Sequence, residues 1–295
     1  MANDPANESF LFIADMHTLT QIKDGELVRH YTQSVAATWL AFGLDPESTV
    51  FYRQSDVPQT AELAWYLSCF FPYQRLTLAH SFKDKSDRLE DVNAGLFSYP
   101  MLMAADILLY DANFVPVGKD QLQHLEITRR VAGSFNHQMG ETFVIPDELT
   151  NTSTMLIPGT DGEKMSKSRD NIINIFLDEK ELKQVINKKI ISDSAPLEEP
   201  KDPDSSVAFK LLEYVGTDAK VKEVREALQA GGYGWGHVKK DLLGSILENY
   251  ASERESYARF MADPALLDEI LANGAKKASA VANEVLGRVR SKIGY

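Results

Sequence analysis

Short apolar segments alternate with helical periodicities over the first 135 or so residues, and this alternation limits the fold more than any other feature. Strands are predicted where brief apolar runs are bounded by polar residues, at 10–14, 49–52 and 114–117. Helices are predicted at about 26–42, 63–70, 100–110 and 121–135. Because helices join successive strands, we expect an α/β fold in which helices cover both faces of a parallel sheet.

The pattern changes after about residue 178. The apolar residues then recur only at helical spacing, and a loop rich in proline and acidic residues interrupts them at 196–206. We therefore predict an α/β domain over 1–176 followed by an all-helical domain over 177–295. In one variant of this division, the last helix packs back on the first domain.

Composition excludes several classes of protein. No apolar run approaches the ~20 residues of a membrane span, and no secretion signal opens the chain, so a soluble cytoplasmic protein is expected. A net charge of −12 argues against a broad nucleic-acid surface, although basic residues gather near the C-terminus. The single cysteine, Cys69, is predicted to be a core residue, and no histidines have metal-ligand spacing.

A loop entered through Pro158 and Gly159 carries the string Lys164-Met165-Ser166-Lys167-Ser168. Two lysines three residues apart can bring two ammonium groups to one polyphosphate and stabilise charge that develops as pyrophosphate leaves. The alternative interpretation is a solvated polar loop.

Asp106 stands inside an otherwise apolar segment that includes Met103. A carboxylate is costly to bury unless a group donates a hydrogen bond to it. An indole N–H is a donor without an acceptor and would fit, with the Met103 sulfur against the ring. The alternatives are a helix N-cap and a buried ion pair.

Five motifs in order resemble the class I aminoacyl-tRNA synthetases, and within them the bacterial-type tryptophanyl-tRNA synthetases, over essentially the whole chain. These motifs are the lysine loop and the segments 12–20, 82–86, 99–110 and 115–121. The resemblance implies a Rossmann-type catalytic domain, which includes the lysine loop, and a helical domain that binds the anticodon part of the tRNA. It also implies a cytoplasmic homodimer.

The resemblance assigns roles to individual residues. Lys164, Lys167 and Lys85 would be catalytic through the phosphates. The ATP site would comprise Gly118, Asp120 at the ribose, and Lys164, Met165, Ser166, Lys167 and Ser168. In the tryptophan site, Tyr99 and Gln121 would hold the α-ammonium. The other residues of that site would be Asp106, Met103, His17, Val115 and Val117. No protein-bound metal is implied, and Mg²⁺ would accompany ATP. Read locally, Asp120 is also a candidate helix cap.

The implied reaction joins tryptophan and ATP to give tryptophanyl-adenylate and pyrophosphate, and then transfers tryptophan to tRNA. One departure from the family bears on it: none of the six histidines lies in a His-x-Gly-His-like or His-x-Gly-Asn-like signature. We expect the first strand and the nucleotide-binding turn to be absent, and this chain to be a poor enzyme. The alternatives are a tyrosine-specific enzyme of the same fold and a non-catalytic module that binds tRNA or another partner.

Overall fold

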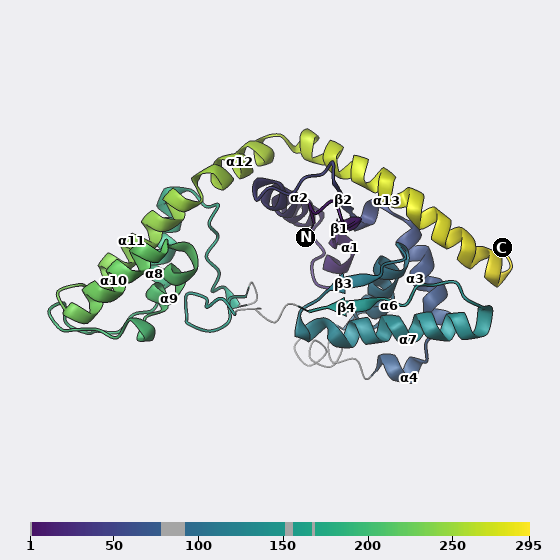
Figure 1. Cartoon of the computed structure of the whole chain (residues 1–295), viewed down its shortest axis with the longest axis horizontal. Helices are drawn as coiled ribbons and strands as arrows, with labels where there is room; N and C mark the ends of the chain where they lie inside the picture. Colours follow the sequence, from purple (N-terminus) through teal and green to yellow (C-terminus); the bar gives the residue numbers. More distant parts are fainter. Residues whose placement is uncertain (1, 78–91, 151–155, 167–168) are drawn as a thin grey trace. The chain divides into compact units, whose positions relative to one another are not determined.

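The computed structural model describes residues 2–77, 92–150, 156–166 and 169–295. They form two compact units (Figure 1), one made of residues up to 154 together with 260–295, the other of 155–259. The units divide the chain at 154/155 and 259/260, which differs from the predicted boundary at 176/177. The lysine loop groups with the helical unit because Met165, Ile173 and Leu177 pack against its core. The catalytic and tRNA-binding roles assigned to the two domains remain predictions.

The first unit carries all the strands of the described chain, in the expected alternation with helices. Its elements are β1 (Ser9–Ile13), α1 (Asp15–Thr18), α2 (Gly25–Ala41), β2 (Thr49–Arg53), the 3₁₀ turn η1 (Gln54–Asp56), α3 (Gln59–Cys69), α4 (Tyr73–Leu76), α6 (Ala94–Leu108), β3 (Phe114–Pro116), the 3₁₀ turn η2 (Lys119–Gln121), α7 (Leu122–Met139), β4 (Asp147–Leu149) and, after the second unit, α13 (Pro264–Ile293).

The predicted strands exist and are parallel. β1 pairs with β2, and Phe10 lies opposite Val50. β3 pairs with β4, a strand that the sequence did not reveal because Asp147–Leu149 is exposed and largely acidic. Within the described chain the strands form these two separate ladders rather than one sheet.

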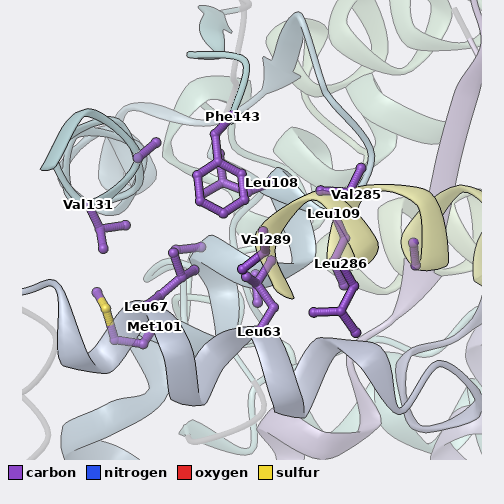
Figure 2. Close-up of a cluster of buried hydrophobic side chains, with 14 of the residues drawn as sticks. Leu63, Leu67, Met101, Leu108, Leu109, Val131, Phe143, Val285, Leu286 and Val289 are labelled. Atoms are coloured by element: carbon purple, nitrogen blue, oxygen red, sulfur yellow. The ribbon is translucent and has the colours of Figure 1, made fainter. Parts of the chain in front are cut away.

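Helix α13, yellow in Figure 1, runs along β2 and α3 within the first unit. Its inward stripe includes Gly274, Ala275, Ala278 and Ala282, whose small side chains let the helix approach the strand closely. Farther along the helix, larger residues fill the core (Figure 2). There Val285, Leu286 and Val289 gather with Leu63 of α3 and Leu109, which follows α6.

Two of the basic residues near the C-terminus, Arg288 and Arg290, form ion pairs from this helix. The Arg288 guanidinium donates to Asp111 at 2.6 Å, and Arg290 makes two hydrogen bonds with Glu62. These pairs fasten α13 to its own unit.

The second unit is helical in its described residues, apart from a single antiparallel bridge between Pro158 and Lys164. Its core includes Leu182, Phe209 and Leu242. The elements that belong to it are α8 (Glu179–Lys189), the 3₁₀ turn η4 (Pro203–Ser205), α9 (Val207–Val215), α10 (Asp218–Ala230), α11 (Trp235–Asn249) and α12 (Ala251–Ala262), the last of which continues past its boundary.

The prediction that Cys69 lies in the core is wrong. The thiol is exposed and contacts the Trp65 carbonyl, because the buried face of α3 is set by Thr60, Leu63 and Leu67. Every helix in the described part of the chain is too short or too polar to cross a lipid bilayer.

Candidate functional site

Asp106 is the buried polar centre of the first unit. It lies near the end of α6, where its residue is 5% exposed, among the buried Ala105 and Ile107. The Gln54 amide nitrogen Nε2 lies 2.8 Å from each carboxylate oxygen, and His17 Nε2 lies 3.0 Å from Oδ2. The position of Asp106 inside α6 removes the N-cap alternative, because the cap of that helix is Asn93.

Burial and hydrogen bonding act on the Asp106 carboxyl in opposite directions. Burial disfavours the charged form and raises its pKa above the ordinary value. Hydrogen bonds from His17 and Gln54 favour the carboxylate and reduce that shift without cancelling it. The alternative of a buried ion pair also remains, because a protonated His17 imidazole would form a salt bridge with Asp106.

The sequence analysis did not identify Gln54 as a partner of Asp106. It is wholly buried and begins η1, directly after the carboxyl end of β2. Ligand sites in parallel sheets gather at the carboxyl ends of strands, so this position was a usable signal. His17 occupies the equivalent place just beyond β1, on the short helix α1. The ends of two paired strands thus meet at one carboxylate.

A second polar pair adjoins this centre. The Tyr99 hydroxyl of α6 lies 2.6 Å from Nε2 of His124, which is buried on α7. The His17 ring meets Tyr99 edge-on, with ring centroids 6.0 Å apart. Met103, one turn after Tyr99 on the same helix, is half-buried. The structure therefore brings His17, Tyr99 and Asp106 together, and it adds Gln54 and His124 to them.

The segment from β3 into η2 carries the remaining predicted residues of the first unit. Val115, Val117 and Gly118 are half-buried, and Asp120 is exposed. The Gln121 amide donates to Asp120 at 3.0 Å. A Cβ atom at Gly118 would lie 2.8 Å from the Asp120 carboxylate, so only glycine avoids this close contact. The cap role considered for Asp120 is not seen, because Gly118 caps η2, Gln121 caps α7, and neither helix has a side-chain cap hydrogen bond.

The lysine loop is shaped by one asparagine that the sequence did not single out. Asn171 is 2% exposed, its Oδ1 accepts from the Ser166 amide at 2.7 Å, and its Nδ2 donates to Asp161 and to the Lys164 carbonyl. A Cβ at Gly159 would stand 2.3 Å from the Asn171 side chain. The exposed Lys164 is thus held at its backbone while its side chain faces solvent.

Three predicted residues, Lys85, Lys167 and Ser168, lie outside the described residues. In the ranges that are described, no three histidine, cysteine, aspartate or glutamate side chains come together as a metal-ion site.

Comparisons with known proteins show the family to which the chain belongs. Residues 3–249 match the family described as tRNA synthetases class I (W and Y). The tryptophan–tRNA ligase of Neisseria meningitidis is 43% identical over 302 residues, covering 99% of this chain and 89% of that protein. The corresponding ligase of Campylobacter jejuni strain RM1221 is also 43% identical, covering 98% and 90%.

Solved structures give the same result. The crystal structure of tryptophanyl-tRNA synthetase from Campylobacter jejuni complexed with ADP and tryptophan matches with a TM-score of 0.93 at 42% identity, covering 98% of this chain and 91% of that one. The Mycoplasma pneumoniae enzyme, at 22% identity and a TM-score of 0.75, shares the fold. The chain therefore belongs to the class I tRNA synthetases for tryptophan and tyrosine, and within them to the bacterial-type tryptophanyl-tRNA synthetases.

Proposed function

We propose that this chain binds tryptophan and ATP, forms tryptophanyl-adenylate, and transfers the tryptophan to its tRNA. The observation that carries the proposal is the buried Asp106 carboxylate, held by Gln54 and His17 in a chain 43% identical to tryptophan–tRNA ligases. Each of the other assignments below extends this one.

Asp106 supplies an acceptor for the indole N–H. An indole nitrogen can only donate, and a charged acceptor roughly doubles the strength of such a bond. The chain uses the same pair of groups elsewhere, where the Trp235 indole donates to Asp193 at 2.5 Å. A phenol hydroxyl could also donate, so the relatives rather than the carboxylate favour tryptophan over tyrosine.

Tyr99 and Gln121 bind the α-ammonium group of tryptophan. The Tyr99 hydroxyl contacts His124 Nε2, and when that nitrogen accepts the phenolic proton, the hydroxyl oxygen can still accept from an ammonium. Gln121 donates through its nitrogen to Asp120, which directs its amide oxygen to act as the second acceptor. His17, Met103, Val115 and Val117 complete the tryptophan site.

ATP binding is assigned to Gly118 and Asp120 and to the lysine loop. In the reaction, a carboxylate oxygen of tryptophan attacks the α-phosphorus of ATP, and the bond from that phosphorus to the pyrophosphate oxygen breaks. No proton has to be removed, so positioning and charge carry the rate. Lys164, Lys167 and Lys85 stabilise the departing pyrophosphate. Mg²⁺ enters with ATP on its phosphate oxygens.

The remaining parts of the proposal concern the tRNA and the assembly. The helical unit binds the anticodon part of the tRNA, and the protein works as a cytoplasmic homodimer. These statements are supported by the family alone. Size measurement in solution and filter binding with the tryptophan tRNA test them separately.

Calorimetric titration of the purified chain with tryptophan and with tyrosine tests the central assignment. We expect tryptophan to bind at least about a hundredfold more tightly. Asp106→Asn, which keeps the side-chain size, should weaken tryptophan binding by about tenfold or more, because the charged acceptor is lost. A preference for tyrosine, or no binding of either, overturns the proposal.

Tryptophan-dependent exchange of pyrophosphate into ATP tests the chemical step. If the chain forms the adenylate, exchange should depend on added tryptophan. Selective tryptophan binding without any exchange would favour the non-catalytic alternative over adenylate formation. Charging of tRNA completes the test.

A further inference from the structure

The Asp106 carboxylate has a specific distribution of hydrogen bonds over its two oxygens. Each oxygen of a carboxylate can accept about two hydrogen bonds. In the described chain Oδ2 is within bonding distance of Gln54 Nε2 and His17 Nε2, whereas Oδ1 is bonded to Gln54 Nε2 alone. The acceptor capacity left for a substrate N–H therefore lies on Oδ1.

Gln54 holds this carboxylate more firmly than His17 does. Its side chain is wholly buried, and its backbone carbonyl accepts from the Val57 amide at 3.1 Å. It directly follows β2, which is fixed by its ladder with β1 and by the close approach of α13. His17 instead belongs to a four-residue helix without a side-chain cap, and its side chain is 21% exposed.

The orientation of the Gln54 amide depends on Asp106. Two acceptor oxygens repel each other, so the nitrogen must face an ionised carboxylate. The amide oxygen Oε1 is buried and has no hydrogen-bond partner among the described residues. No other described group therefore competes for the amide, and its N–H is committed to the carboxylate.

We propose that Gln54 is the positioning residue for side-chain recognition: it fixes Asp106 so that Oδ1 faces the N–H of the substrate ring. This inference rests on the proposed function and adds a residue to it. Gln54 would act on specificity for the ring nitrogen rather than on ATP or on the reacting carboxylate.

The test compares two ligands that differ only at the ring nitrogen. Tryptophan and its benzothienyl analogue, in which sulfur replaces the indole N–H, are titrated into the parent chain and into Gln54→Met. Methionine has a similar length and no N–H. We expect the ratio of the two affinities to fall at least about tenfold in Gln54→Met, because an unfixed carboxylate no longer selects the donor. Affinity for ATP should be unchanged.

Gln59→Met is the matched control, since Gln59 lies five residues away and its amide donates to Asn283 of α13 instead. Its affinity ratio should equal that of the parent. If Gln54→Met does not fold, Gln54→Asn, which keeps the amide and shortens its reach, carries the same comparison.

If the role of Gln54 is purely structural, Gln54→Met should bind both ligands more weakly by the same factor. An affinity ratio within about twofold of the parent would therefore overturn the inference. This outcome is distinct from failure of the proposed function. In that case the parent itself would not prefer tryptophan to its sulfur analogue, and both proposals would fall.

Discussion

Replacement of Gly274 by alanine should destabilise the protein at the contact between α13 and β2. An ideal Cβ at this position would lie 1.8 Å from the Phe51 carbonyl oxygen and 2.6 Å from its carbon. Ordinary contacts require about 3.5 Å, so the helix or the strand must move by roughly 1.5 Å. The obstacle is strand backbone, which cannot rotate away as a side chain can.

The magnitude follows from two opposing contributions. Overpacking of this kind costs about 3 kcal/mol or more. Alanine in a helix interior recovers about 1 kcal/mol relative to glycine. The net loss is at least about 2 kcal/mol, or a fall in Tm of about 4–8 °C for a folding unit of this size.

Gly287→Ala in the same helix is the control. Gly287 is exposed, and a Cβ there meets nothing within 4 Å. This substitution should therefore raise Tm by about 2–4 °C. Thermal unfolding, monitored by circular dichroism, distinguishes the expected fall in Tm of Gly274→Ala from the expected rise in Tm of Gly287→Ala. If both alanines stabilise the protein, the close packing of α13 on β2 is wrong.

The same pair of variants should differ in ligand binding. β2 ends at Arg53, immediately before Gln54, so a displaced strand should disturb the support of Asp106. The rise in Tm produced by saturating tryptophan should shrink in Gly274→Ala and persist in Gly287→Ala. An equal rise in Tm in both variants would show that the position of β2 does not affect tryptophan binding.

Four further outcomes are expected. Lys164→Ala should slow adenylate formation by about a hundredfold with little change in tryptophan Kd, as measured by rapid quench, and the reverse pattern would contradict its phosphate role. Asn171→Ala removes three side-chain hydrogen bonds of the lysine loop and should slow the same step by about tenfold while exposing the loop to proteases; unchanged values of both would refute the scaffold role. Because burial raises the pKa of Asp106 above 3.8 and the carboxylate accepts an N–H more strongly than the neutral carboxyl does, tryptophan affinity should be full above that raised pKa and fall as pH drops through it; titrations that stay flat down to pH 3.8 would exclude this. The hydrogen bond from Arg290 lowers the pKa of Glu62, so this pair should stabilise the fold above pH 4.5 and lose that effect as pH falls through the lowered value. Solvent screens this exposed pair, so the contribution should be small, and denaturant titrations of Glu62→Gln should lack this pH dependence.

Local patterns in the sequence were sufficient for most of the elements. Brief apolar runs marked β1 and β2, because a strand that packs into the core needs apolar residues. A similar run marked β3, although that strand is largely exposed. Helical periodicity marked α2, α3, α6 and α7. The need of Asp106 for hydrogen-bond donors was predictable, because a carboxylate in an apolar segment requires a donor whatever the fold around it.

The partners of that carboxylate were decided by the tertiary structure. Gln54 and His17 lie 52 and 89 residues from Asp106, and only the pairing of β1 with β2 brings the ends of these strands to α6. The grouping of the lysine loop with the helical unit, and of α13 with the first, likewise depends on packing between distant segments. A single sequence records which residues can be buried or can donate. It does not record which of them meet, because that depends on contacts summed over the whole fold.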